Sequence, residues 1–275
     1  WQAVERLGEG TCGEVWKEQY CSPVSGTSPN IFRAVKHIPK RKGSSAKASK
    51  REIKALTTFS NRSVIEYQQH FIQILGWFED ETHWCIAMEF VEHGNLQQHI
   101  NRECIPEPEA ALITSQIAQA LLYMHTKKLV HRDLKPLNIL VVHSGPEWHV
   151  KVGDFGITRD LSETRTATHH IGTFSYMAPE VWDTSQRYTF DIDVWALGAI
   201  AFCMRTGSPP FPNPTTLGHY QNDPTSFPIQ GLRSSSQPCR GFILDSMAAI
   251  PQERLTITEV LGHHWLCRNK KPVKR

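Results

Sequence analysis

The sequence predicts an α+β fold in two parts: a small, mostly antiparallel β-sheet with one main helix, followed by a mostly helical part. Short β-rich runs separated by turn residues fill roughly the first ninety positions. Apolar residues at helical spacing then take over, and one later segment is apolar on nearly all sides. The change of character near 91–94 predicts two lobes, and a cleft between lobes is where ligands commonly bind.

The first part is predicted to hold the strands of the sheet. Strands are expected over 1–8, 15–21, 31–38, 71–78 and 83–91, where residues alternate or are rich in β-branched and aromatic types. Ile53 and Leu56 lie at helical spacing, which predicts a helix over 49–59. Residues 60–70 show no clear period and receive no assignment.

The second part is predicted to contain two long helices and one short hairpin. Residues 109–127 carry apolar side chains at 3.6-residue spacing, which indicates an amphipathic helix of about five turns. Short β segments are expected over 137–142 and 150–155, around a turn at 143–147. The run 194–204 is apolar almost throughout, so its helix should be buried at the centre of a domain.

Composition excludes several classes of protein. Charged residues make up 21% of the 275 positions and hydrophobic residues 40%. A disordered chain has a higher charge and fewer apolar residues than this. The 30 Lys and Arg against 27 Asp and Glu give a net charge of +3, which is too small to indicate a nucleic-acid partner. The longest apolar run is shorter than the ~20 residues of a membrane span. We therefore expect neither a nucleic-acid partner nor a membrane span.

Cysteine usage predicts the compartment. The 7 cysteines are scattered, odd in number and never spaced C-x-x-C, which favours a reducing, intracellular and cytoplasmic location. Basic runs at 39–42 and 270–275 leave a nuclear address open, with a solvated loop and a polar terminus as the alternative. The chain begins on Trp1 inside a predicted strand, so we expect a segment of a longer protein.

A glycine-rich segment at 7–15 reads LGEGTCGEV and contains G-x-G-x-x-G-x-V. Glycines let the backbone approach a phosphate closely and offer N–H donors to it. A glycine-rich hairpin without a ligand is an equal alternative for this pattern alone. A Rossmann turn is disfavoured because a strand-like run follows, and a Walker loop is excluded because no Gly-Lys-Ser/Thr follows.

A lysine and a glutamate follow the glycine segment at positions that suit phosphate binding. Lys36 lies on the third predicted strand, and Glu52 lies sixteen residues later on the predicted helix. A carboxylate is needed to hold a flexible lysine side chain in place. An ordinary surface pair is the alternative, but after a glycine hairpin the pair is typical of a phosphate clamp.

Further motifs follow in a fixed order. The full series is GEGTCGEV at 8–15, AVK at 34–36, REIKAL at 51–56, HRDLKPLN at 131–138, GDFG at 153–156, GTFSYMAPE at 172–180, DVWALG at 193–198, and Arg254. This series resembles the eukaryotic protein kinases of the serine/threonine type over nearly the whole chain. The resemblance implies a single kinase domain over 1–275 with a bilobal fold, the N-lobe at about 1–91 and the C-lobe at about 92–270.

The resemblance implies a catalytic set for phosphoryl transfer, which needs positioning and charge neutralisation more than covalent chemistry. Asp133 would accept the proton of the substrate hydroxyl, and Lys135 would stabilise charge on the transferring group. Asp154 and Asn138 would hold Mg²⁺ through hard oxygen ligands. The full catalytic set implied by the resemblance is Asp133, Lys135, Lys36, Glu52, Asn138 and Asp154.

An ATP site is also implied by the resemblance. Met88 would stand at the back of the adenine pocket, Glu89 and Val91 would bond the adenine edge, and apolar residues would cover the ring. Core packing is an equal reading of those apolar residues. The implied nucleotide-binding residues are Leu7, Gly8, Glu9, Gly10, Thr11, Cys12, Gly13, Glu14, Val15, Ala34, Lys36, Met88, Glu89, Val91 and Leu140.

Regulation is expected in the loop 154–180. In the family that this chain resembles, an arginine before the catalytic aspartate, here Arg132, goes with activation by loop phosphorylation from an upstream kinase. Thr168 is the first choice of phosphosite and Thr166 the second, with Arg159 as a further phosphate ligand.

Two structural links are carried over from the same resemblance. Asp193 is expected to tie its helix to the backbone of the catalytic loop. Glu180 and Arg254 are expected to form a buried ion pair.

The sequence thus predicts a serine/threonine protein kinase that phosphorylates protein hydroxyls with Mg-ATP. The first alternative is a pseudokinase or scaffold module that binds ATP or partners without turnover, and it is disfavoured because none of the catalytic residue types is missing. The second alternative, a small-molecule kinase, is disfavoured by the segment 172–180, which is typical of a platform for peptides.

Overall fold

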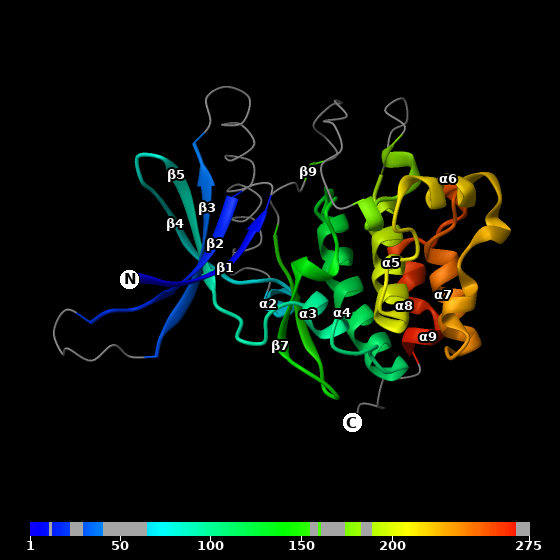
Figure 1. Cartoon of the computed structure of the whole chain (residues 1–275), viewed down its shortest axis with the longest axis horizontal. Coiled ribbons are helices and arrows are strands. Elements are labelled where there is room, and N and C mark those ends of the chain that lie inside the picture. The colour runs from blue at the N-terminus through cyan, green and yellow to red at the C-terminus, as the bar shows by residue number, and fades with distance from the viewer. Residues whose placement is uncertain are drawn as a thin grey trace. The chain divides into compact units, whose positions relative to one another are not determined.

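The computed structural model describes residues 1–10, 13–22, 30–40, 65–154, 159–160, 174–182 and 189–267. The chain divides into two compact units, which we call unit one, Trp1–Glu92, and unit two, His93–Arg275. Figure 1 shows the sheet strands of unit one and the helices of unit two. The predicted N-lobe and C-lobe were bounded at about residue 91, and the treatment of both as one domain stays a prediction.

Unit one is built on a five-stranded antiparallel sheet with the strand order β1-β2-β3-β5-β4. Its elements are β1 (Gln2–Gly10), β2 (Gly13–Gln19), β3 (Phe32–Pro39), α2 (Ile65–Gln68), β4 (Ile74–Glu79) and β5 (His83–Glu89). Val35 on the central strand β3 forms a buried cluster with Cys85 and Ala87 on the neighbouring strand β5. The predicted antiparallel sheet is therefore confirmed.

Two details of unit one differ from the prediction. The strand predicted over 71–78 begins only at Ile74. Phe71 and Ile72 are apolar because they are buried, although they precede the strand. The unassigned segment 60–70 contains the short helix α2. The helix predicted over 49–59 lies outside the described residues.

Unit two is mostly helical, as predicted. Its helices are α3 (Leu96–Ile100), α4 (Glu107–Thr126), α5 (Asp191–Thr206), α6 (Pro214–Asn222), α7 (Gln237–Ser246), α8 (Ile257–Gly262) and α9 (His264–Cys267). Helix α4 packs against α5, α8 and α9. Trp195, Leu197 and Ile200 of α5 are fully buried, which confirms that this helix forms the centre of the unit. It ends at Gly207, whose φ of 80° is a left-handed conformation that glycine adopts without steric cost.

Short strands and turns complete unit two. They are β6 (Leu129–Val130), β7 (Ile139–His143), β8 (His149–Val152), β9 (Arg159–Asp160), and the 3₁₀ turns Pro136–Asn138, Phe174–Tyr176, Pro179–Val181, Pro224–Ser226, Ile229–Leu232 and Pro251–Glu253. Strands β7 and β8 form the predicted hairpin, and β6 pairs with β9. Within the described parts of the chain, none of the helices has the length and apolar character needed to cross a bilayer.

Candidate active site

The catalytic loop 131–138 brings three predicted site residues together in unit two. The Asp133 carboxylate accepts hydrogen bonds from Lys135 Nζ at 2.7 Å and from Asn138 Nδ2 at 3.2 Å. Asn138 Nδ2 also donates to the Asp133 backbone carbonyl at 2.7 Å. All three side chains are largely shielded from solvent, so these charge-assisted bonds fix the carboxylate in one orientation.

Asp193 anchors this loop from the first turn of α5. Its buried carboxylate accepts the backbone N–H groups of His131 at 2.9 Å and Arg132 at 3.1 Å. Arg132 has a φ of 71°, an uncommon left-handed conformation that the two bonds help to hold. The predicted tie between Asp193 and the catalytic loop is confirmed.

The sequence did not reveal the other partner of this carboxylate, His125. Its Nε2 lies 3.0 Å from Asp193 Oδ2, and both side chains are buried. His125 is one of several polar residues on the amphipathic helix α4, and no spacing rule marks it. The only available signal was its position six residues before His131 in the same segment.

The ionisation of Asp193 follows from these contacts. Burial alone would raise its pKa, but the hydrogen bond and charge of His125, with the N–H donor of His131, outweigh burial and hold the pKa below its ordinary value. The resulting stabilisation is complete above the unfolded-state pKa of about 3.9. It is lost only as pH falls through the lower pKa of the folded state, so the anchor is intact at neutral pH.

The hairpin β7–β8 places the two predicted metal ligands at its open end. Ile139 pairs with Val152, and the Gly153 N–H donates to the Asn138 carbonyl at 2.9 Å. Asn138 therefore lies opposite Gly153, the residue that precedes Asp154. Because Asn138 Nδ2 is used on Asp133, its Oδ1 is the atom suited to a cation. An amide oxygen and a carboxylate are the hard donors that Mg²⁺ prefers, so the donor set fits this metal.

A small cavity lies beside Asp133 in unit two. Arg132, Asp133 and Leu134 line it from the catalytic loop, and Tyr176 and Met177 line it from the segment 172–180. Two segments more than forty residues apart in the sequence therefore meet next to the carboxylate.

The predicted pair of Glu180 and Arg254 is confirmed. The guanidinium donates to both carboxylate oxygens, at 2.7 and 3.1 Å, and both side chains are buried. Arg254 also donates to the backbone carbonyls of Asp191 and Ala248, and it lies over the Trp195 ring at 5.1 Å. This ion pair thus fixes the end of the segment 172–180 to the core of unit two.

The glycine segment in unit one is the hairpin between β1 and β2. Gly8 pairs with Val15 and Gly10 with Gly13. Gly13 has a φ of 142°, and a Cβ there would lie 1.9 Å from the His37 carbonyl oxygen, so only glycine fits. The carboxylates of Glu9 and Glu14 both contact Arg6 Nη2, at 2.5 and 3.0 Å.

The central strands of unit one carry four other predicted nucleotide-binding residues. Lys36 lies on β3 between Val15 and Ile86 of the neighbouring strands and is 7% exposed, and a lysine is rarely so buried. Ala34 pairs with Met88 two residues along the same strands. Glu89 ends β5, where its N–H and its carboxylate both bond the backbone of Gln73.

The remaining predicted site residues are distributed as follows. Leu7 is exposed on β1, Val91 follows β5, and Leu140 lies on β7 in unit two. Strand pairing sets the backbone of Arg159 opposite Val130, two residues before Arg132. Five residues lie outside the described part of the chain, namely Thr11, Cys12, Glu52, Thr166 and Thr168.

Comparison with known proteins gives a consistent picture. A family model for the protein kinase domain matches residues 1–266. The chain is 32% identical to a serine/threonine-protein kinase SBK1 of Danio rerio and 31% identical to an Aurora kinase of Saccharomyces cerevisiae, in each case over 97% of the chain and 69% of the relative. It is 29% identical to the yeast cell cycle serine/threonine-protein kinase CDC5/MSD2, over 94% of the chain. The chain spans only 35% of that last relative's length.

Proposed function

The chain belongs to the protein kinase domain family, in its serine/threonine class, and on this premise we propose that it transfers the γ-phosphate of Mg-ATP to Ser and Thr hydroxyls of protein substrates. The observation that carries the proposal is the Asp133 carboxylate, held by Lys135 and Asn138 beside a cavity. Phosphoryl transfer requires a positioned acceptor for the proton of the attacking hydroxyl together with a local positive charge.

Each residue of the loop has a role in the proposed reaction. Asp133 orients the substrate hydroxyl and takes its proton as the oxygen attacks phosphorus. Lys135, 2.7 Å from that carboxylate, carries the charge that balances the transferring phosphoryl group. Asn138 keeps the aspartate in place because its Nδ2 donates to both the backbone carbonyl and the carboxylate of Asp133.

The nucleotide and metal would be held by other predicted residues. Asp154 and Asn138 would bind Mg²⁺, which when bound neutralises the negative charge of the phosphates. Lys36 would contact phosphate oxygens, with Glu52 orienting its side chain. The glycine hairpin would supply backbone N–H donors to the phosphates, and Met88, Glu89 and Val91 would contact the adenine.

This function is tested by the incorporation of labelled phosphate from ATP into a generic basic protein. We expect incorporation that requires Mg²⁺ and disappears in the Asp154→Asn variant, with wild-type folding in that variant by circular dichroism. A scaffold module, the second candidate, would bind ATP and give the same background incorporation with and without Mg²⁺.

Activity is further proposed to depend on phosphorylation of the loop 154–180 by an upstream kinase. Two arginines support the idea, because the β6–β9 pairing sets the backbone of Arg159 opposite Val130, close in sequence to Arg132. A phosphate between such cations forms charge-assisted bonds that order a loop.

Replacing both favoured phosphosites, Thr166→Ala with Thr168→Ala, is expected to lower kcat at least about tenfold, since one to three charge-assisted bonds would be lost. Turnover is compared with that of phosphatase-treated wild type, which should match the double variant. Ser162→Ala with Thr164→Ala provides the matched control in the same loop. Undiminished turnover of the Thr166/Thr168 variant would refute the assignment.

We further propose an intracellular, cytoplasmic location with protein substrates as partners, the nucleus remaining the alternative. The described cysteines support it, because all six are free thiols: Cys21, Cys85, Cys104, Cys203, Cys239 and Cys267. A fluorescent fusion that enters the secretory pathway would contradict this location.

A further inference from the structure

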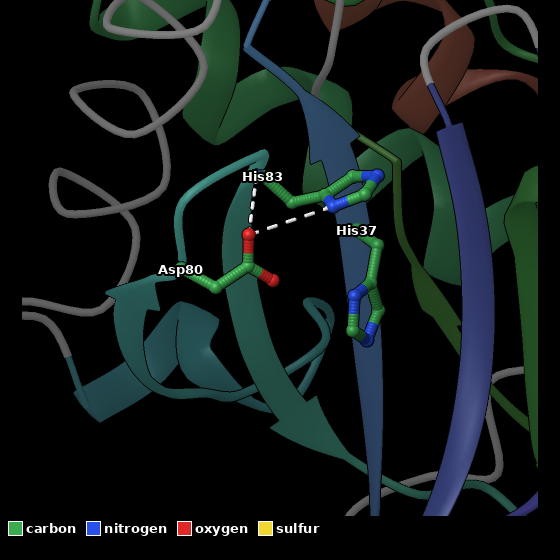
Figure 2. A group of neighbouring side chains, drawn as sticks. All are labelled: His37, Asp80 and His83. Atoms are coloured by element: carbon green, nitrogen blue, oxygen red, sulfur yellow. Dashed lines mark hydrogen bonds and ion pairs between the residues drawn. The ribbon is translucent and has the colours of Figure 1, made fainter.

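Three potential metal ligands, none of them among the residues proposed for the kinase reaction, meet at one end of the sheet in unit one. His37 comes from β3, Asp80 from the turn between β4 and β5, and His83 from the start of β5, as Figure 2 shows. One ligand atom from each lies within 4.8 Å of the other two. We propose that this cluster, His37–Asp80–His83, is a binding site for a divalent transition metal, with Zn²⁺ the best match.

Strand register brings the two histidines together. His37 pairs with Cys85 and Pro39 pairs with His83, so the histidines lie two positions apart on the same face of the β3–β5 ladder. Their ring centroids are 5.8 Å apart, and His83 Nδ1 lies 3.6 Å from Asp80 Oδ1. The sheet register thus sets the positions of the two histidines, and the turn between β4 and β5 supplies Asp80.

The spacing is close to that of a bound zinc. Ligands lie about 2.0–2.2 Å from Zn²⁺, so tetrahedral neighbours are about 3.4 Å apart. The three ligand atoms now lie within 4.8 Å of one another, so each pair must approach by at most about 1.4 Å to bind the ion. Rotation of the two imidazoles can supply it, because both histidines are partly exposed.

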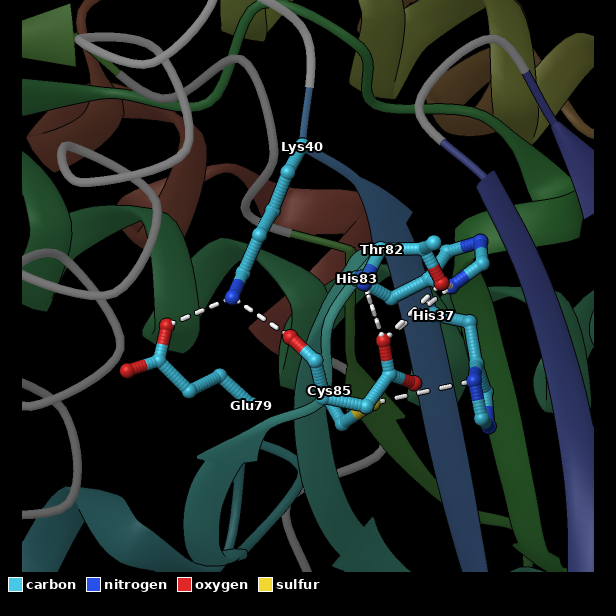
Figure 3. Close-up of polar contacts among 7 residues, drawn as sticks. His37, Lys40, Glu79, Thr82, His83 and Cys85 are labelled. Atoms are coloured by element: carbon cyan, nitrogen blue, oxygen red, sulfur yellow. Dashed lines mark hydrogen bonds and ion pairs between the residues drawn. The ribbon is translucent and has the colours of Figure 1, made fainter.

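The carboxylate is already oriented by bonds on one of its oxygens. Asp80 Oδ1 accepts the N–H groups of Thr82 at 2.7 Å and His83 at 2.6 Å, and the Thr82 hydroxyl at 3.0 Å. These three hydrogen bonds all end on Oδ1, so Oδ2 is the oxygen suited to a metal. Lys40 Nζ donates to the Asp80 backbone carbonyl at 2.5 Å and lies 2.8 Å from the Glu79 carboxylate. Figure 3 shows the ion pair of Lys40 with Glu79. Such surrounding bonds hold a ligand in place before metal arrives.

The groups that now contact the imidazoles are easily displaced. His83 Nδ1 lies 2.8 Å from the Thr82 hydroxyl, which can rotate away. His37 Nδ1 lies 3.6 Å from Cys85 Sγ, a weak hydrogen-bonding partner. Because Cys85 is fully buried, we assign three protein ligands, with water completing the shell.

The donor types select the metal. Imidazole nitrogens with one carboxylate suit Zn²⁺ and its neighbours in the first transition row, whereas Mg²⁺ takes oxygen ligands. A bound ion would join β3 to the β4–β5 turn and stabilise unit one.

The test uses the whole chain, titrated with Zn²⁺ and separately with Mg²⁺ in isothermal calorimetry, with Co²⁺ absorption as a second probe. We expect one Zn²⁺ that His37→Gln, Asp80→Asn and His83→Gln each weaken at least about tenfold, because even outer-shell substitutions weaken metal sites by 10–100-fold. Asp80→Asn keeps an oxygen for the turn bonds, so this variant should fold normally. His219→Gln, an exposed histidine on α6, is the matched control and should bind Zn²⁺ like wild type.

Free thiols elsewhere in the chain could also bind zinc, so the Co²⁺ spectrum separates the two sources. The proposed site predicts tetrahedral Co²⁺ bands without a thiolate charge-transfer band, unchanged in Cys85→Ala. The proposal would be overturned if wild type bound no Zn²⁺, or if His37→Gln, Asp80→Asn and His83→Gln bound Zn²⁺ as tightly as the control His219→Gln. A thiolate band at full strength in the Co²⁺ spectrum would also overturn it.

Discussion

Replacing Asp133 with asparagine is expected to lower kcat by roughly 10²–10⁴-fold, the range that a general base contributes. Asparagine has the same shape and still offers an oxygen to Lys135 and Asn138, so the loop should keep its geometry. The substitution removes the negative charge that receives the proton of the substrate hydroxyl. Initial rates of phosphate transfer at saturating ATP measure the effect, and KM for ATP should change little because Asp133 is not among the proposed nucleotide contacts.

A matched control separates this effect from a general loss of acidic charge. Asp245→Asn changes an exposed aspartate on α7 in the same way and should leave kcat unchanged. If Asp133→Asn and Asp245→Asn were equally active, Asp133 could not be the base.

Replacing Arg254 with methionine should destabilise the protein by about 3–5 kcal/mol, the usual result of removing one partner of a buried ion pair. The Glu180 carboxylate would remain buried without its two charge-assisted bonds, and two backbone carbonyls would lose a donor. Urea unfolding followed by tryptophan fluorescence is a suitable measurement, since Trp195 lies under the guanidinium.

Two further variants test whether the cost comes from the unpaired charge. Arg233→Met removes an exposed arginine and should change the unfolding free energy by no more than about 0.5 kcal/mol. Adding Glu180→Leu to Arg254→Met should recover part of the loss, because no charge is then left buried. A cost below about 1 kcal/mol for Arg254→Met alone would show that the pair contributes little.

The sequence was most informative where the chemistry is local. Asp133, Lys135 and Asn138 lie within one loop, so their spacing alone brings them into contact. The apolar run 194–204 likewise predicted the buried helix α5, although its C-terminal end is set by the left-handed Gly207, which an apolar pattern does not register.

Contacts between distant residues could not be predicted in the same way. His125 reaches Asp193 across 68 positions, and this pairing depends on how α4 packs against α5. His37 meets Asp80 and His83 only through the register of β3 and β5, since a slip of one residue would turn His37 to the other face. The strand predicted from residue 71 starts too early for a different reason, because the buried residues Phe71 and Ile72 give the same apolar signal as a strand.

Transfer of phosphate to Ser and Thr hydroxyls can be tested with a mixed peptide library. The library presents Ser, Thr and Tyr acceptors in random surroundings with Mg-ATP, and mass spectrometry locates each phosphate formed. The proposed function predicts phosphoserine and phosphothreonine with wild type, little or no phosphotyrosine, and background levels with Asp133→Asn. Background levels with both proteins, with ATP still bound, would contradict it and favour a module that binds without turnover.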